Sequence, residues 1–247
     1  MAAKEKFTQE LSIPCYMTDI SRKLRPLAFM DLSQAVATLA ADELEFGDIQ
    51  MLEKHGAVWV LARMKVEFLR MPEHREKVTL STWHKGLDSL FFVRDYQMSD
   101  AAGNAIINAT SSWVVMNVEE RRVLRSEALS DIIPGNPQCA DNAIEKPAGK
   151  VVIPKTLATR KVGSHRVSYS DVDYNRHANN AKYTVWAMDC LPEELVYNRP
   201  LKKICLNFNR EALPGEVIDL FCSCDGETFY VEGRCNDLQV FVCSLKF

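Results

Sequence analysis

The stretch DVDYNRHANNAKYTVWAMDCLP, residues 171–192, changes character near its middle. Its first ten positions hold two acids, one histidine and three asparagines. The remainder is apolar, and Tyr183, Trp186, Ala187 and Cys190 recur at the spacing of one helix face. The stretch therefore predicts a hydrogen-bonding loop that leads directly into a buried helix.

A similar step occurs earlier in the chain. Residues 18–44 run from a predicted strand end into a helix, and Pro26 suits the first helical position. After each helix comes a β-rich segment that contains Phe-x-Arg and then proline, at residues 68–72 and 208–214. The sequence therefore predicts two α+β units, each with several antiparallel strands and one long helix.

A segment rich in proline and glycine separates the two units. Prolines at 134, 137, 147 and 154 prevent a continuous helix or central strand there. We therefore predict an N-terminal domain at residues 1–131, a linker at residues 132–155 and a C-terminal domain at residues 156–247. Within the two domains, hairpin breaks are expected at residues 99–104 and 236–237.

Composition narrows the class of protein. The 247 residues are 47% apolar and 26% charged, with a formal net charge of −3. Neither the basic excess of a nucleic-acid-binding protein nor the polarity of a disordered chain is present. No run approaches the roughly 20 apolar residues of a membrane span, and the N-terminus lacks the apolar core of a signal peptide. We expect a cytoplasmic protein with no nucleic-acid partner and no membrane partner.

Eight cysteines lie at irregular spacing along the chain. This pattern predicts free thiols in a reducing compartment rather than a disulfide framework. A zinc site at Cys222, Cys224, Cys235 and Cys243 is disfavoured, because the first two alternate within an apolar strand and no histidine follows at finger-like spacing. We expect no metal and no cofactor.

The polar run resembles the helix start of the hotdog thioesterases. Two tandem copies, with Asp173, Asn175 and His177 in the second, are similar to the acyl-ACP thioesterases of bacteria and plant plastids, and an Arg-Glu pair matches at residues 210–211. The resemblance spans nearly the whole chain. It implies an α+β tandem (double) hotdog fold, each half an antiparallel sheet wrapped around one long helix. The plant pattern often has cysteine after the glutamate, but this chain has Ala212, which excludes a nucleophilic cysteine there.

The same residues suit thioester hydrolysis, which needs a base for water and donors for the oxyanion. Glu211 or Asp173 can be the base, because a carboxylate partly removed from water has a raised pKa. His177 is the other candidate, or it passes a proton to the leaving thiol. Asn175 can orient the water or the carbonyl. The predicted catalytic residues are thus Asp173, Asn175, His177 and Glu211.

The helix start supplies the predicted oxyanion site. Backbone N–H groups near Asn179 and Asn180 lie at the positive end of the helix dipole, where they can stabilise negative charge on the thioester oxygen. Simpler interpretations remain for individual residues. Asp171 is expected to be a turn or cap residue, and Glu211 shares a strand face with Asn207 and Asn209 that could be merely solvated.

The first unit provides an internal comparison. Aligning residues 18–20 with residues 170–172 places Ser21, Lys23 and Arg25 opposite Asp173, Asn175 and His177. Aligning Phe68 with Phe208 places Met71 opposite Glu211. The first unit thus has the scaffold without the chemistry, and we predict one active centre per chain, in the second unit.

The resemblance gives the first unit a different task, an apolar tunnel for the acyl chain. Its helix around residues 29–44 and the side chains of Trp59, Phe91 and Phe92 are candidates for the tunnel wall, with Met30 and Ala35 named for the helix. Ordinary core packing is the alternative, because periodicity alone does not separate the two.

The expected partner is an acyl carrier protein that carries a fatty acyl chain. Six basic residues and no acidic residue lie between 146 and 170, a run that suits an acidic carrier or its phosphate. A solvated linker is the alternative. The sequence leaves open whether two chains form a homodimer.

The leading function is hydrolysis of fatty acyl-ACP thioesters to free fatty acids, in fatty acid biosynthesis and lipid metabolism. An acyl-CoA thioesterase is the nearest variant. A hotdog hydratase or dehydratase is disfavoured, because an asparagine-rich helix start suits carbonyl activation and water attack. A non-catalytic acyl-thioester-binding protein is disfavoured by the intact set of acids, asparagine and histidine.

Overall fold

A computed structural model describes residues 6–125, 129, 131–133 and 139–247. In both halves a strand leads through a loop into a helix, and four further strands of the main sheet follow. The first half consists of β1 (Phe7–Ser12), η1 (Cys15–Met17), α1 (Pro26–Glu43), α2 (Asp48–His55), β2 (Ala57–Phe68), β3 (Lys77–Asp88), β4 (Phe91–Asp100), β5 (Ala105–Asn117) and the short β6 (Arg122–Val123). The second half consists of β7 (Arg160–Arg166), α3 (Lys182–Asp189), α4 (Glu193–Asn198), β8 (Lys203–Phe208), β9 (Val217–Asp225), β10 (Thr228–Cys235) and β11 (Leu238–Lys246).

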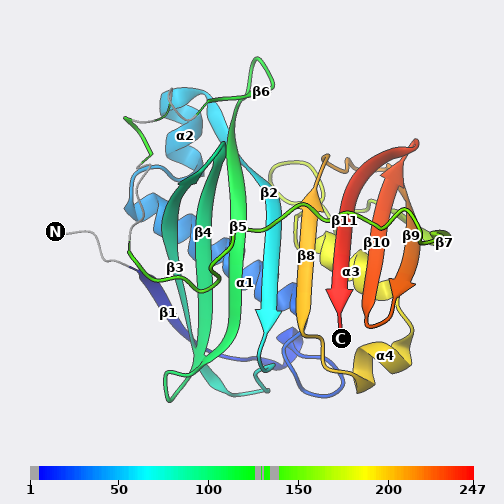
Figure 1. Cartoon of the computed structure of the whole chain (residues 1–247). Helices are drawn as coiled ribbons and strands as arrows, with labels where there is room; N and C mark the ends of the chain where they lie inside the picture. The colour runs from blue at the N-terminus through cyan, green and yellow to red at the C-terminus, as the bar shows by residue number, and fades with distance from the viewer. Residues whose placement is uncertain (1–5, 126–128, 130, 134–138) are drawn as a thin grey trace.

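The two halves share one antiparallel sheet. Its strand order is β1-β3-β4-β5-β2-β8-β11-β10-β9-β7, and β6 pairs with β5 off this path. Each half contributes the same order outward from the centre, where β2 pairs with β8 from Arg63↔Asn207 to Glu67↔Lys203. The duplicated α+β architecture is as expected, with the two sheets fused along one shared edge (Figure 1).

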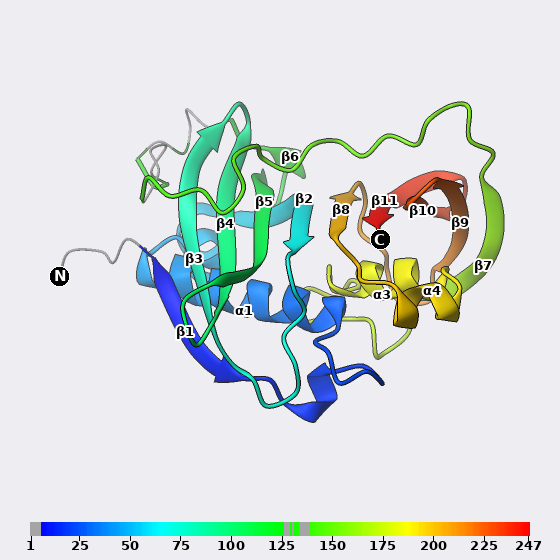
Figure 2. The ribbon, with the colours of Figure 1, turned by 60° about the horizontal axis from the view of Figure 1, so that its bottom comes forward.

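Helix α1 lies against the concave face of the first half of the sheet (Figures 1 and 2). Pro26 begins it, as predicted, because a fixed φ suits the first turn and no N–H is lost there. Its buried face includes Phe29, Met30 and Val36, which pack against the strands. Among the described residues no helix is long and apolar enough to cross a membrane.

The helix of the second half is shorter than the expected long one. α3 has eight residues and ends at Asp189, and α4 begins only after Pro192. Proline disfavours a helical residue before it and removes a helical hydrogen bond, so Pro192 divides what would otherwise be one helix. The buried residues of α3 are Tyr183, Thr184, Trp186 and Ala187.

Turns and bulges shape the sheet near its edges. Asn236 and Asp237, with φ of 48° and 61°, make the two-residue turn between β10 and β11, where a hairpin break was predicted. Residues 101–104 similarly join β4 and β5, inside the other predicted break. β2 has a register shift between Leu61 and Arg63, and β3 has one between His84 and Gly86, which increase the local bend of the sheet.

Residues 139–159 contain no helix or strand and cross the face of the sheet opposite the helices (Figure 1). Hydrogen bonds fasten this segment, called the strap here, to both halves. The Trp83 indole N–H donates to the Asp141 carbonyl (2.9 Å), and the Val151 N–H donates to Asn207 Oδ1 (2.6 Å). The strap therefore covers the junction between the halves.

Candidate active site

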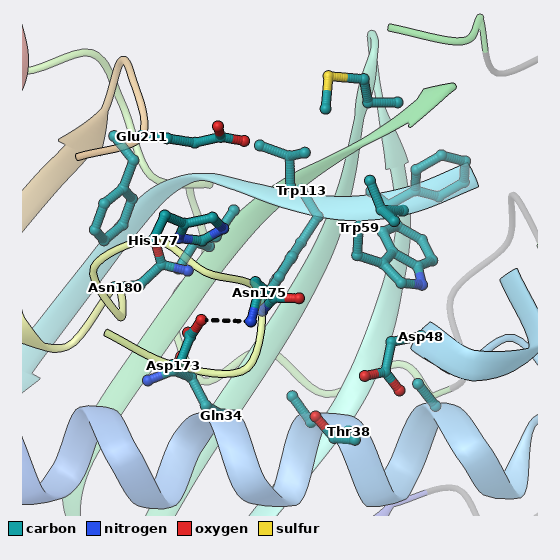
Figure 3. Close-up of a pocket in the computed structure, with 18 of the residues that line it drawn as sticks. Gln34, Thr38, Asp48, Trp59, Trp113, Asp173, Asn175, His177, Asn180 and Glu211 are labelled. Atoms are coloured by element: carbon teal, nitrogen blue, oxygen red, sulfur yellow. Dashed lines mark hydrogen bonds between the residues drawn. The ribbon is translucent and has the colours of Figure 1, made fainter. Parts of the chain in front are cut away.

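One cavity of about 960 Å³ lies between the sheet, α1 and the loop that precedes α3. Five of the six predicted site residues line it: Asp173, Asn175, His177, Asn180 and Glu211. Figure 3 shows these side chains gathered at one end, with Trp59 and Trp113 of the first half farther along. The structure therefore brings together residues that lie 38 positions apart in the sequence.

Asp173 organises the loop. Its N–H donates to the carbonyl of His177 (3.1 Å), and its Oδ1 accepts from the Asn175 N–H (2.9 Å). Arg176, at φ 66°, makes the left-handed turn between them and donates its N–H to the Asp173 carbonyl. These contacts aim the Asn175 and His177 side chains toward the cavity (Figure 3).

The first half contains the same loop, two positions away from the predicted alignment. Asp19 donates to the Lys23 carbonyl and accepts from the Ser21 N–H, as Asp173 does with His177 and Asn175. Arg22 has φ 61°, matching Arg176. Asp19 is therefore the counterpart of Asp173, and the predicted pairing of Ser21 with Asp173 is wrong. The corrected pairs are Ser21 with Asn175, Lys23 with His177, and Arg25 with Asn179.

The second predicted alignment, Phe68 with Phe208, is confirmed. In each half the two backbone N–H groups after this phenylalanine donate to one carbonyl oxygen. Leu69 and Arg70 donate to Ile106, and Asn209 and Arg210 donate to Val240. The following arginine then pairs with a glutamate: Arg70 with Glu76 (2.6 Å) and Arg210 with Glu216 (2.5 Å). Arg210 is therefore a structural residue, and Met71 is the counterpart of Glu211.

These two comparisons separate scaffold from chemistry. The carboxylate of Asp173 has a counterpart in Asp19 of the first half, where the histidine and the asparagines are missing. Asp173 therefore serves at least in part to hold the turn. Asn175, His177, Asn179 and Glu211 have no such counterpart, because serine, lysine, arginine and methionine stand there.

The imidazole of His177 is half-buried and has a defined orientation. Nδ1 lies 3.1 Å from the carbonyl oxygen of Ala178, which can only accept, so Nδ1 carries a proton. In the neutral ring this leaves the lone pair on Nε2. His177 therefore presents a proton acceptor at the cavity that it lines.

Glu211 follows β8 and reaches the same end of the cavity, with its side chain 40% exposed. Its Oε2 lies 3.5 Å from Nη2 of Arg121, which belongs to the turn between β5 and β6. An exposed pair at this distance adds little stability. The pair matters for the charge that it places at the site: Arg121 of the first half puts a cation beside the Glu211 carboxylate of the second half. Sequence reasoning missed Arg121, which lies 90 positions away with no motif around it.

The backbone beside Glu211 is held from two sides. The Ala212 N–H donates to the hydroxyl of Tyr183 (3.1 Å), and the Ala212 carbonyl accepts from the Ala178 N–H (2.8 Å). Burial, with nearby carboxylates, raises the pKa of Tyr183, so this hydroxyl stays protonated. Its counterpart Phe29 packs edge-on against Phe68, as Tyr183 does against Phe208, but has no hydroxyl. Tyr183 is thus a core residue, as expected, that also fixes the site.

Asn179 differs from its predicted role. Its N–H donates to the Asp171 carbonyl (2.8 Å), its Oδ1 accepts from the Ala181 N–H (2.8 Å), and its Nδ2 donates to Asp173 Oδ2 (3.2 Å). These groups are used within the protein, so Asn179 is not an oxyanion donor. Asn180 lines the cavity instead, and among the described residues nothing accepts its backbone N–H.

Asp171 lies outside the cavity and is 5% exposed. Its Oδ2 accepts from Nε2 of His165 (2.9 Å) and from the Ser168 N–H (2.8 Å). Burial alone would raise the pKa of Asp171, but these hydrogen bonds hold it below its ordinary value. The ring of His165 in turn stacks on Trp186, 4.6 Å between centroids. Asp171 therefore supports α3, in agreement with its predicted turn role.

Asp48 and Tyr174 form a further link across the cavity. The Tyr174 hydroxyl donates to Asp48 Oδ2 at the start of α2 (2.5 Å), and both residues line the cavity. The hydrogen bond to this carboxylate, with partial burial, raises the pKa of Tyr174 to about 12. The loop that precedes α3 in the second half is thereby tied to α2 of the first half.

The far end of the cavity belongs to the first half and is largely apolar. Trp59 and Phe92 line it, as expected, but Phe91 does not. The two residues named for the helix were wrong, because Met30 is in the core and Ala35 is exposed. From α1 the cavity is instead lined by Gln34, Ala37, Thr38 and Ala41. A helix has several faces, and only the packing of the sheet decides which one meets the cavity.

Cysteines take no part in the cavity. All eight lie in the described part of the chain and are free thiols. No group of three or more histidine, cysteine or acidic side chains among the described residues could hold a metal ion.

Comparison with known proteins places this geometry in a family. The model of the acyl-ACP thioesterase N-terminal domain matches residues 4–132, and that of the C-terminal domain matches residues 155–239. The chain belongs to the acyl-ACP thioesterase family. A crystal structure of an acyl-ACP thioesterase from Bacteroides thetaiotaomicron superposes with a TM-score of 0.86 at 25% identity, covering 98% of both chains.

Further relatives support the same assignment. The oleoyl-acyl carrier protein thioesterase of Coriandrum sativum, named as chloroplastic, is 28% identical over 238 residues, which is 90% of this chain and 63% of that protein. The chain spans 49% of the length of an Arabidopsis thaliana relative with the same activity in its name. The 12:0-ACP thioesterase from Umbellularia californica has the same fold, with a TM-score of 0.82, 21% identity and coverage of 98% and 97%. The tandem hotdog architecture is confirmed.

Proposed function

We propose that this chain hydrolyses fatty acyl thioesters carried by acyl carrier protein and releases the free fatty acid. One observation carries the proposal: a single cavity joins a polar cluster found only in the second half to an apolar chamber built by the first. A thioester has the matching shape, with a reactive polar carbonyl at one end of a long apolar chain. The names of the relatives agree with this substrate.

In the proposed reaction His177 Nε2 takes a proton from water as the water oxygen attacks the thioester carbon. The carbonyl electron pair moves onto oxygen, where the Asn180 N–H and the Asn175 and Asn180 amides donate hydrogen bonds. When the intermediate collapses, the carbon–sulfur bond breaks and His177 returns the proton to the leaving sulfur. Glu211 opposes the positive charge that His177 carries between these steps.

Asp173 has a positioning role in this proposal. Both its carboxylate oxygens accept hydrogen bonds inside the loop, from the Asn175 N–H and the Asn179 amide. A carboxylate so occupied is a poor acceptor for a proton from water. It holds Asn175 and His177 in place, and Asn179 holds Asp173.

The carrier protein is proposed to approach where the cavity opens. Arg121 and Arg176 line the cavity and are exposed, so basic side chains border the opening. The strap, whose sequence holds Lys146, Lys150 and Lys155 of the predicted basic run, crosses the other face of the sheet (Figure 1). We therefore favour the arginines at the opening as the electrostatic guide for an acidic carrier.

Release of free thiol from acyl-ACP and acyl-CoA of several chain lengths tests the proposal. Faster release from acyl-ACP supports it, and faster release from acyl-CoA favours the acyl-CoA variant. Water loss from a β-hydroxyacyl thioester without thiol release would indicate a dehydratase, and tight binding without any turnover would indicate a binding protein. The free thiols suit a reducing compartment such as the cytoplasm.

A further inference from the structure

A buried arginine lines the apolar part of the cavity. Arg94 lies on β4 and is 6% exposed. Its Nη1 donates to the hydroxyl of Thr82 (3.3 Å), a neutral group. Among the described residues no carboxylate lies within ion-pair distance of its guanidinium. A buried cation without a counterion is costly, so its presence in the wall of a fatty-acyl pocket needs a reason.

The neighbouring acid does not supply the missing charge. Asp95 follows Arg94 on the same strand, so its side chain points to the opposite face of the sheet. There Asp95 pairs with Lys85 (3.2 Å) and accepts from the Ala143 N–H of the strap (2.8 Å). Burial lowers the pKa of Arg94, but a guanidinium remains protonated at neutral pH. Arg94 therefore offers N–H donors to the cavity.

The position of Arg94 limits where its partner can be. β4 is two strands from β2, which lines the same cavity, and three from β8, which Glu211 follows. With strands about 4.8 Å apart, the separation across the sheet is roughly 10–14 Å. An extended chain advances about 3.5 Å for every three bonds, so roughly eight to twelve bonds span it. His84, which pairs opposite Arg94 on β3, lines the same region.

Resting on the function proposed above, we propose that the cavity selects acyl chains of about ten carbons that carry an oxygen at the far end, a hydroxyl or a carboxylate, which Arg94 binds. An oxygen acceptor would satisfy the donors that an alkyl end leaves unpaired. The carboxylate would also supply the missing counterion. The neutral chain end of an ordinary fatty acid would instead meet a desolvated charge.

Three ACP thioesters that differ only at the far end test this inference: decanoyl, ω-hydroxydecanoyl and ω-carboxynonanoyl. For the wild-type protein we expect kcat/KM at least about tenfold higher for the two oxygenated chains, since hydrogen bonds to charged groups are worth this much. Arg94→Met should remove that preference, so that the three thioesters are hydrolysed with similar kcat/KM. Arg63→Met is the control, because Arg63 stacks on Phe91 and does not line the cavity.

The comparison of the three thioesters in the wild type decides the inference even if Arg94→Met fails to fold. Hydrolysis of decanoyl-ACP by the wild type as fast as that of both oxygenated chains would overturn the inference and leave the proposed function standing. If no thioester is hydrolysed, the proposed function fails. Calorimetric titration with decanoate and decanedioate then decides: tighter binding of the diacid, lost in Arg94→Met, supports the role of Arg94, and equal binding contradicts it.

Discussion

His177 is the residue on which the proposed chemistry depends most. Its Nδ1 is committed to the Ala178 carbonyl, so Nε2 is the acceptor. We expect His177→Ala to lower kcat by at least about 100-fold, the usual contribution of a general base, with little change in thermal stability. Lys23→Ala alters the matching loop position of the first half and should leave turnover near wild type. Thiol release measures both, and equal rates for the two variants would contradict the assignment.

Tyr183 acts on the site through the backbone of Ala212. In Tyr183→Phe the ring can keep its packing, as Phe29 does in the first half, but the Ala212 N–H loses its acceptor. We expect a loss of about 1–3 kcal/mol in unfolding free energy. Because Glu211 is then less well placed, kcat should fall while KM stays nearly constant. Steady-state kinetics and urea unfolding test this, with Tyr169→Phe, at an exposed tyrosine, as control. A change in KM alone would argue against positioning.

Asp171 should make stability depend on pH. Its folded pKa is lowered, so its contribution is present above the unfolded value of 3.8 and disappears as pH falls through the folded value. The unfolding free energy of the wild type should therefore decline below about pH 4. Asp171→Asn should have a lower unfolding free energy at neutral pH, and this free energy should change less as the pH falls below about 4. Urea unfolding at pH 3 to 7 measures it, at about one pH unit per step. Parallel curves for the two proteins would show that another group controls the acid branch.

Most residues of the candidate site could be named from the sequence, and the errors have physical causes. His177, Asn175 and Glu211 could be named because hydrogen-bonding side chains crowd a helix start and a strand end. The register of the first-half loop was misplaced by two positions, because a loop has no periodicity to fix it. Only the left-handed pair Arg22 and Arg176 and their hydrogen bonds reveal the true alignment.

At the scale of elements, the strap is the feature that sequence reasoning described least well. Proline and glycine correctly excluded helix and strand, but they do not show that backbone groups of the strap bond to the sheet. Asn207 illustrates this: its Oδ1 accepts from the Val151 N–H and its Nδ2 donates to the Gly149 carbonyl (3.2 Å), 4% exposed. Seen in sequence alone, Asn207 looked like part of a solvated strand face.

The strap should therefore contribute to stability through Asn207. Asn207→Ala removes two hydrogen bonds and leaves the Val151 N–H buried, so we expect a loss of about 1–3 kcal/mol in unfolding free energy. Cleavage in the strap by a protease at low concentration should also become faster. Asn209→Ala is the matched control, because the exposed side chain of Asn209 donates its hydrogen bond to the side chain of Gln239 (2.8 Å) and not to the strap. Equal stability of the two variants would mean that the strap is held elsewhere.

At the scale of the whole molecule, neither half contains a complete site. The first half supplies the apolar chamber, Arg121 and Arg94, and the second supplies His177 and Glu211. The continuous sheet fixes their relative positions through the β2–β8 pairing. That pairing could not be foreseen, because a strand sequence shows which face is buried but not which edge will meet another unit.

Because the chamber is separate from the chemistry, its length should be adjustable without loss of the reaction. Ala41 lines the cavity from α1 and packs against the cluster around Phe46 and Trp59. In Ala41→Trp the indole should occupy part of the chamber. We therefore expect kcat/KM to fall at least about tenfold more for decanoyl-ACP than for hexanoyl-ACP, because the far methylenes of the longer chain lose their apolar contacts. Ala35→Trp, on the exposed face of the same helix, should change neither. A uniform loss for both chain lengths in Ala41→Trp would show that α1 supports the chemistry as well as the chamber, and that the two halves do not divide their tasks.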